Sequence, residues 1–218
     1  MPVPSHVQAA LNHFAVRVAA LLGLLTLLAI QVSTSGWLTS ADEPVTSWLV
    51  EHRTPVLTTI ARTVTNVGGP PEVAVLACVA AAWLVWRRRS PEPAAVLIGT
   101  VLFAGVASTL LKRAVARQRP PVALHLVTET NYSFPSGHAT GTAALVAALV
   151  AVRMIPWLVA AGVTAVVALT RLYLGVHWFS DVLAGALLGT VAALLCAGLT
   201  QLISQRSHRP AGAHSGPS

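Results

Sequence analysis

Residues of the types that bind and attack a phosphate group occur in three short clusters of an otherwise mostly apolar chain. Together the clusters supply three fixed cations, two histidines, one carboxylate and a glycine turn. These groups can hold an anion and provide a nucleophile with its orienting partner. In chain order, the clusters are Lys112 with Arg119, then residues 135–138 (Pro-Ser-Gly-His), then Arg171, His177 and Asp181. Their complementary chemistry predicts one catalytic anion site.

The first cluster contains the only lysine of the chain, Lys112, beside thirteen arginines elsewhere. On a continuing helix, residues seven apart lie nearly on one face, so Lys112 and Arg119 could face one anion. Arginine offers a planar fork to two phosphate oxygens, whereas lysine offers a compact charge. Arg113 and Arg117 point about a quarter turn away on such a helix and are expected to contact lipid headgroups. A basic patch at the membrane interface is the alternative interpretation of the whole cluster.

The second cluster precedes an apolar segment and has the residues of a helix start. Proline suits the first turn, and Gly137 lets the backbone approach a ligand closely. The free N–H groups of that turn form an anion site, to which the Ser136 hydroxyl adds a donor. His138 then stands at the edge of this site. The alternative is an ordinary N-cap beside an interfacial histidine.

The third cluster pairs a histidine with a carboxylate. His177 and Asp181 are four residues apart, so they are neighbours if the last helix begins near Val176. A carboxylate bonded to one ring nitrogen fixes the tautomer and leaves the other nitrogen free to attack. Arg171 could complete the phosphate cradle. On its own, the pair could equally be a hydrogen bond on a helix surface.

Taken together, the clusters resemble the type 2 phosphatidic acid phosphatase family, which shares its site design with vanadium haloperoxidases. The family pattern is Lys, six residues, Arg-Pro; then Pro-Ser-Gly-His; then Ser-Arg, five residues, His, three residues, Asp. This chain matches the pattern in order within residues 111–203. One departure is Thr170, where the family usually has serine; the hydroxyl is retained.

The resemblance implies a role for each matched residue. His177 attacks phosphorus and forms a phosphohistidine, Asp181 orients it, and His138 protonates the leaving oxygen before water hydrolyses the intermediate. No metal or other cofactor is implied, because fixed cations offset the charge on the phosphoryl oxygens. The phosphate-binding residues implied are Lys112, Arg119, Ser136, Gly137 and Arg171.

Composition indicates the elements that must position these residues. The chain is 55% hydrophobic and 10% charged, with a mean hydropathy of +0.69. Soluble domains carry about a quarter charged residues. We therefore expect an all-α polytopic membrane protein, and the family resemblance implies an acid phosphatase/vanadium haloperoxidase-like helical core. The six predicted transmembrane helices cover residues 14–32, 71–86, 94–111, 137–152, 156–174 and 179–203. The second and fourth are short for a membrane span.

Charge in the loops predicts the orientation and argues against nucleic acid as a partner. Arginines between and after the apolar runs, such as residues 87–89 and Arg153, suit a cytoplasmic face. Both termini would then be cytoplasmic, with the three clusters at the periplasmic or exterior face of the plasma membrane. An amphipathic helix near residues 45–64 is expected on the membrane surface. We predict one domain over residues 1–204 and a disordered tail over residues 205–218.

A lipid phosphate or diphosphate is the expected substrate, because a site at the membrane interface is reached laterally from the bilayer. An isoprenoid diphosphate such as undecaprenyl diphosphate is the first choice, and phosphatidic acid or phosphatidylglycerophosphate is the alternative. The high hydropathy of the chain argues against a soluble vanadium haloperoxidase. A non-catalytic lipid-binding or transport protein would not need two histidines with a carboxylate partner. The oligomeric state is left open.

Overall fold

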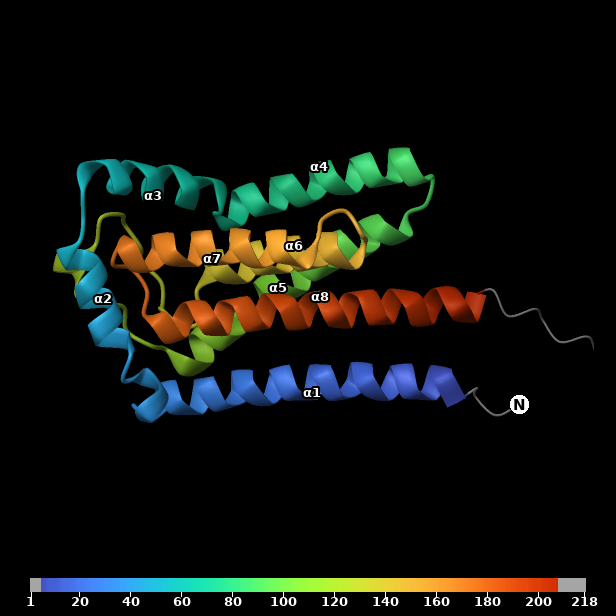
Figure 1. The fold of residues 1–218 in the computed structure, drawn as a ribbon, viewed down its shortest axis with the longest axis horizontal. Helices are drawn as coiled ribbons and strands as arrows, with labels where there is room; N and C mark the ends of the chain where they lie inside the picture. Colours follow the sequence, from blue (N-terminus) through green and yellow to red (C-terminus); the bar gives the residue numbers. More distant parts are fainter. Residues whose placement is uncertain (1–4, 208–218) are drawn as a thin grey trace, which may run out of the picture.

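The computed structural model describes residues 5–207, and all regular secondary structure within them is helical. This agrees with the predicted all-α class. The elements, shown in Figure 1, are α1 (Ser5–Ser33), η1 (Trp37–Thr39), α2 (Asp42–Glu51), α3 (Pro55–Val67), α4 (Pro70–Arg88), α5 (Glu92–Val115), η2 (Val122–Leu124), α6 (Gly137–Ala151), α7 (Trp157–Tyr173) and α8 (Phe179–Ser207).

Four of these helices are long and apolar enough to cross a membrane. They contain the stretches Asn12–Ser33, Pro70–Arg88, Glu92–Val115 and Phe179–Ser204. Helices α6 and α7 are also apolar but have only 15 and 17 residues. At about 1.5 Å per residue they are shorter than the roughly 30 Å hydrocarbon core. The fold is that of an integral membrane protein, whereas the predicted count of six crossings goes beyond what these lengths establish.

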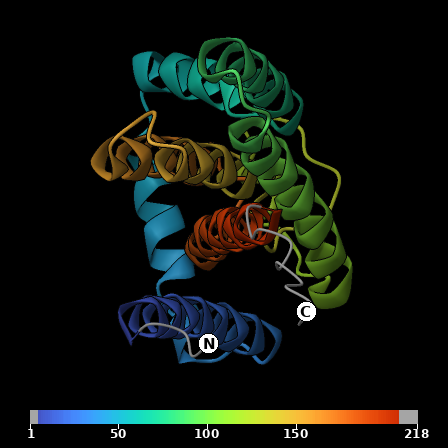
Figure 2. The same cartoon turned by 90° about the vertical axis from the view of Figure 1, so that its right-hand side faces the viewer.

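Helix α8 occupies the middle of the bundle, where α1, α5 and α6 pack around it (Figure 2). Two glycines let it approach α6 closely. A Cβ atom at Gly185 would lie 2.7 Å from the Ser136 carbonyl oxygen, and one at Gly189 would lie 2.5 Å from the Thr140 carbonyl oxygen. Any side chain there would force the helices apart. The close contact holds the start of α6 against the start of α8.

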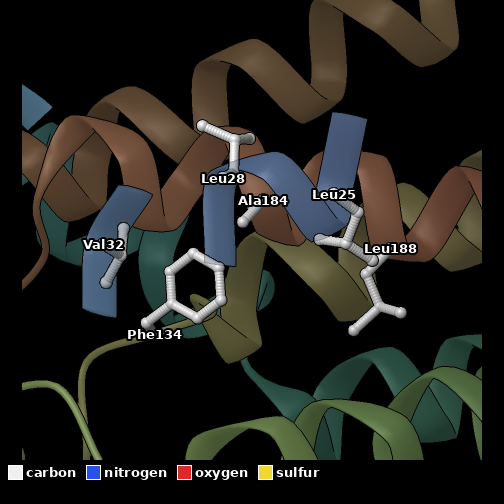
Figure 3. Close-up of a cluster of buried hydrophobic side chains, with 6 residues drawn as sticks. All are labelled: Leu25, Leu28, Val32, Phe134, Ala184 and Leu188. Atoms are coloured by element: carbon white, nitrogen blue, oxygen red, sulfur yellow. The ribbon is translucent and has the colours of Figure 1, made fainter. Parts of the chain in front are cut away.

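A buried phenylalanine anchors the segment that leads into α6. Phe134 is fully buried among apolar side chains of α1 and α8 (Figure 3). Burial of such a side chain contributes about 1.5–3 kcal/mol. The cluster consists of Leu25, Leu28, Val32, Phe134, Ala184 and Leu188. It fixes the approach of the 135–138 motif to the bundle.

The prediction of one amphipathic helix over residues 45–64 is wrong, because the segment forms two helices, α2 and α3. Pro55 begins α3, and the Thr54 side chain caps it by accepting from Leu57 N at 3.2 Å. The Tyr173 hydroxyl also accepts from Thr54 N at 2.9 Å, which ties the break to the end of α7. Figure 1 shows α2 lying across one end of the bundle.

The two ends of the bundle differ in what they carry. The N-terminal end of α1 and the C-terminal end of α8 lie together, opposite the end crossed by α2 (Figure 1). The α4–α5 connection, next to Arg87 and Arg88 in the last turn of α4, lies at the same end as the termini. Helix α8 continues to Ser207, and residues 208–218 of the predicted tail lie outside the described residues.

Candidate active site

The three clusters meet at the end of the bundle crossed by α2. Ser136 N donates to the Asp181 carbonyl oxygen at 3.0 Å, which joins the start of α6 to the first turn of α8. Arg119 Nη1 lies 3.1 Å from His177 Nε2. The first motif, through Arg119, and the second motif, through Ser136, are therefore each in direct contact with the third motif.

His177 is buried in the turn between α7 and α8, with a different partner at each ring nitrogen. Its Nδ1 lies 3.4 Å from Asp181 Oδ2, and its Nε2 faces Arg119. Because a guanidinium can only donate, Nε2 must accept, and the ring hydrogen is then on Nδ1 and points to Asp181. The lone pair of Nε2 thus lies on the side of the cationic Arg119.

Burial determines the charge of this imidazole. Desolvation lowers the pKa of His177 to about 4, and the hydrogen bond and charge of Asp181 oppose this only in part. The ring is consequently neutral at pH 7, which is the form that can act as a nucleophile. Helix α8 begins at Phe179, as the predicted span of residues 179–203 had it, so the condition that the helix begin near Val176 is not met. His177 meets Asp181 across a tight turn rather than along a helix.

The Asp181 carboxylate is held by more than the histidine. Its Oδ2 accepts from Trp178 N at 2.9 Å and from the Ser133 hydroxyl. Its Oδ1 accepts from Arg117 Nη1 at 2.7 Å. Both oxygens are thus occupied, and the side chain is fully buried. A carboxylate fixed in this way holds the histidine in one orientation.

The guanidinium of Arg119 is held by hydrogen bonds to Asn131 on one side and to the Val176 carbonyl oxygen on the other. Nε donates to Asn131 O at 2.7 Å, and Nη2 donates to Asn131 Oδ1 at 2.5 Å. Nη1 donates to Val176 O at 2.5 Å, beside His177. Burial lowers the pKa of Arg119 and the charge of Glu129 raises it, yet an arginine stays protonated at neutral pH.

Arg171 is buried with one donor left over. Nη1 donates to Thr65 Oγ1 at 2.6 Å, and Nη2 donates to Glu129 Oε1. Its Nε has no hydrogen-bond partner within the part of the chain that the structure describes. A buried unsatisfied donor is rare and calls for a ligand or water. This donor lies on a residue that the family pattern assigns to phosphate.

Glu129 is a site residue that the motif reasoning missed. Its two carboxylate oxygens reach different arginines, Oε1 to Arg171 Nη2 and Oε2 to Arg119 Nη2, the latter at 3.3 Å. An anionic group therefore bridges two cations of the cradle. Glu129 lies in the connection between α5 and α6, where no periodic pattern could have identified it.

Lys112 contacts backbone rather than side chains. Its Nζ donates to the carbonyl oxygens of Tyr132 and Pro135 at 2.7 Å and to that of Ser133 at 3.4 Å. The ammonium thus holds the segment that enters α6. The helix argument that placed Lys112 and Arg119 on one face is wrong, because α5 ends at Val115 and the left-handed Ala116 turns the chain away.

The second motif forms the N-terminus of α6. Ser136 is the N-cap, is fully buried, and accepts from Ala139 N at 3.5 Å. Gly137 and His138 are the first two residues of the helix. His138 is half-buried and lies within electrostatic reach of Arg171 and His177. The start of α6 therefore opens onto the same site.

Arg117 does not behave as expected from the sequence. It was predicted to contact lipid headgroups, but its guanidinium is largely buried and bonds Asp42, Ser180 and Asp181. The turn at Ala116 is the reason, because it directs Arg117 inward instead of along the helix face. Asp42 and Ser180 had no signal in the motifs.

The structure is an all-helical membrane bundle in which a buried histidine, its carboxylate partner and several arginines converge on one site. The PAP2 superfamily profile matches residues 93–204, which include all three motifs. The chain belongs to the PAP2 superfamily. This confirms the resemblance seen in the motifs.

Relatives of known function are lipid phosphatases. Phosphatidylglycerophosphatase B of Bacillus subtilis is 32% identical over 76% of this chain and 86% of its own length. Decaprenylphosphoryl-5-phosphoribose phosphatase of Mycobacterium tuberculosis is 42% identical over 40% of this chain and 51% of its own. Undecaprenyl-diphosphatase of Sulfolobus acidocaldarius is 33% identical over 50% and 56%. These relatives hydrolyse phosphate esters or diphosphates of lipids, which confirms the predicted enzyme class.

Solved structures show the same fold. The crystal structure of a transmembrane PAP2-type phosphatidylglycerolphosphate phosphatase from Bacillus subtilis has a TM-score of 0.75 and 25% identity. It covers 89% of this chain and 98% of that chain. LpxE of Aquifex aeolicus has a TM-score of 0.61 at 21% identity, with 73% of this chain and 96% of that chain covered.

Proposed function

We propose that this chain is a metal-independent lipid phosphate or diphosphate phosphatase that acts through a phosphohistidine. One observation carries the proposal: the neutral His177 presents the lone pair of Nε2 beside Arg119, while Asp181 holds the opposite nitrogen. The unpartnered Nε of Arg171 adds a buried donor of the kind that an anion would satisfy.

The chemistry proceeds in two transfers. Nε2 of His177 attacks phosphorus, the bond from phosphorus to the leaving oxygen breaks, and His138 delivers a proton to that oxygen. Water then attacks the phosphohistidine, His138 takes a proton from it, and inorganic phosphate leaves as the phosphorus–nitrogen bond breaks. The cations stabilise charge on the phosphoryl oxygens in both steps. The groups assigned to phosphate are Lys112, Arg119, Ser136, the Gly137 amide and Arg171.

The donor set supports the proposed metal independence. Within residues 5–207, no group of three or more His, Cys, Asp or Glu side chains is arranged to hold a metal. The carboxylates near the site bond to arginines instead, as Glu129 and Asp181 do. Fixed cations can supply the electrostatic stabilisation that Mg²⁺ gives other phosphoryl-transfer enzymes.

An apolar groove beside the site supports a lipid substrate. It has a volume of about 680 Å³ and is lined by α6, α7 and α8. Leu172 in its wall follows Arg171 in the chain, Val182 follows Asp181, and Phe179 precedes Asp181 by two residues. A hydrocarbon chain in this groove would have its phosphate end near the cradle.

Two substrate classes have support. An isoprenoid diphosphate such as undecaprenyl diphosphate is our first choice, in keeping with the polyprenyl substrates named for two of the relatives. Phosphatidylglycerophosphate or phosphatidic acid is the second, because the relative named phosphatidylglycerophosphatase B aligns over 76% of this chain.

The same proposal includes six membrane crossings with the site at the exterior face. Helices α6 and α7 would cross as short spans beside α8. The shared end of the termini carries Arg87 and Arg88, which suits the cytoplasm under the positive-inside rule. A site at the exterior face would act on lipids of the outer leaflet.

Phosphate release by the purified protein tests the function. The panel contains undecaprenyl diphosphate, phosphatidylglycerophosphate, phosphatidic acid and a soluble phosphate ester, each with EDTA. We expect turnover of the lipid substrates, inhibition by orthovanadate, and loss of turnover in His177→Ala. A strict need for Mg²⁺, or a phosphoenzyme trapped in His177→Ala, would contradict the mechanism.

A further inference from the structure

Arg117 joins two buried carboxylates that come from opposite ends of the sequence. Nη2 donates to Asp42 Oδ2 at 2.6 Å, and Nη1 donates to Asp181 Oδ1 at 2.7 Å. Asp42 is in the first turn of α2, and Asp181 is in the first turn of α8. Both carboxylates are at most 4% exposed. The contact thus connects α2 to the partner of His177.

Asp42 is itself held in place by α8. Its Oδ1 accepts from Ser180 N, and its Oδ2 accepts from the Ser180 hydroxyl, both at 2.8 Å. Arg117 Nη1 also donates to the Ser180 hydroxyl oxygen at 2.7 Å. The guanidinium lies over the Trp178 ring, with 5.6 Å between Cζ and the ring centroid. Asp42 and Trp178 together fix the position of the Arg117 fork.

The fork decides which Asp181 oxygen faces the histidine. Oδ1 is taken by Arg117, so Oδ2 is left to His177, Trp178 N and Ser133. Without Arg117, Trp178 N and Ser133 would still hold Oδ2, but Oδ1 would lose its partner and the carboxylate would hold the imidazole less firmly. Arg117 also places a positive charge on the far side of Asp181, which partly balances the charge that Asp181 presents to His177.

We propose that Arg117, held by Asp42, is a positioning residue that fixes the Asp181 carboxylate and thereby the nucleophilic His177. This inference rests on the proposed role of His177. The alternative is a structural role only, in which the Asp42–Arg117 pair fastens α2 to the bundle. If the role is structural only, removing the pair would alter stability but leave the ionisation of His177 unchanged.

The ionisation of His177 distinguishes the two roles. Removing the cation behind Asp181 lets this carboxylate stabilise a protonated imidazole more strongly, so the pKa of His177 should rise. The acid limb of kcat/KM should then move to higher pH. The charged and titratable groups that also face His177 or Asp181 are the same in every variant: Lys112 of α5, Arg119 and Glu129 of the α5–α6 connection, His138 of α6 and Arg171 of α7.

The experiment compares Arg117→Met, Arg117→Lys and Asp42→Asn with the wild type, using dioctanoyl phosphatidic acid in detergent micelles. Arg113→Met is the matched control, because Arg113 is exposed and lies four residues earlier. We expect kcat of Arg117→Met to fall about ten- to a hundredfold, the range found when groups that orient metal-binding residues through hydrogen bonds are removed. KM should stay within about twofold, since the guanidinium of Arg117 is bonded to Asp42, Ser180 and Asp181 and the proposal gives it no contact with substrate.

Arg117→Lys should recover only part of kcat, because a compact ammonium cannot reproduce the planar fork that places Nη1 on Asp181 and Nη2 on Asp42. An unchanged pH profile and kcat in folded Arg117→Met would overturn the inference and leave the structural role only. A raised KM at constant kcat would also overturn it, because Arg117 would then bind substrate. If Arg117→Met does not fold, Asp42→Asn and Arg117→Lys give the same readouts. Full activity of His177→Ala would instead refute the proposed function.

Discussion

At the scale of single residues, the arginines of the site are each paired with a carboxylate, whereas Lys112 bonds to backbone oxygens. Arg117 bonds Asp42 and Asp181, and Glu129 bridges Arg119 and Arg171. Buried charges are costly unless they are paired and hydrogen-bonded. The pairing explains how a bundle of apolar helices can hold so many ionised groups at one end.

The environment of His177 predicts its titration. Burial lowers the pKa of His177 to about 4, so in the folded protein this ring should take up its proton at a pH far below the usual pKa of about 6.5. The unfolded chain binds the proton more readily between these values, so stability should fall as the pH drops from 6.5 towards 4. We expect ¹⁵N NMR of histidine-labelled protein in detergent to show a neutral Nδ1–H ring at pH 7, with His177→Asn assigning the signal. A midpoint near 6.5 would contradict the buried geometry.

Lys112→Arg should be poorly tolerated although the charge is kept. An ammonium can direct its N–H groups at the three surrounding carbonyl oxygens, whereas a planar guanidinium is longer and cannot. The segment entering α6 would shift, and we expect kcat/KM to fall by on the order of tenfold or more. Arg113→Lys is the matched control on the exposed neighbour. Near-normal kcat/KM in Lys112→Arg would mean that the lysine is not required.

Glu129 occupies the cations that we assign to phosphate, so it should compete with that anion. Glu129→Gln keeps the shape but removes the charge between Arg119 and Arg171. We expect inorganic phosphate to inhibit this variant about tenfold more strongly, equivalent to about 1.4 kcal/mol. Glu51→Gln, at an exposed carboxylate, serves as the control. Weaker inhibition would show that Glu129 orients the arginines instead of competing with phosphate.

At the scale of elements, hydropathy predicted the helices well and the connections poorly. Helix α6 was expected over residues 137–152 and spans Gly137–Ala151, because a continuous apolar run in a membrane protein has few alternatives to a helix. The segment from Ala116 to Ser136 has no such continuous apolar run. Within it, Arg117 contacts Asp42 and Asp181, which lie 75 and 64 residues away in the sequence. No local pattern could therefore reveal the role of Arg117.

The close packing of α6 on α8 is an element-scale requirement that can be tested. Gly189→Ala would bring a methyl group to about 2.5 Å from the Thr140 carbonyl oxygen, so the two helices must separate. Overpacking of this kind costs about 1–3 kcal/mol. We expect a lower melting temperature and lower kcat/KM, because the start of α6 carries Ser136 and His138. In Gly162→Ala, the control, the added methyl group meets nothing within 4 Å. Equal stability of the two variants would refute the close contact.

At the scale of the whole molecule, the bundle separates two kinds of positive charge. The site end holds arginines that are paired with the carboxylates of Asp42, Asp181 and Glu129. The opposite end holds exposed arginines, including residues 87–89, at the end of the bundle where α1 begins and α8 ends. The number of lysines and arginines in the short loops on each side sets the orientation in a membrane. Lys112, Arg117 and Arg119 at the site end would count against an orientation with this end outside, and their contacts inside the site give them another role.

This separation predicts that the site faces the exterior and the termini face the cytoplasm. In a background with Cys78→Ala and Cys196→Ala, single cysteines at Ala123→Cys and Ser90→Cys report the two ends. An impermeant maleimide on intact cells should label Ala123→Cys, near the site, but not Ser90→Cys, beside the arginines. Permeabilised cells should label both, which controls for accessibility. The reverse pattern on intact cells would place the site in the cytoplasm, and a substrate in the outer leaflet would then be out of its reach.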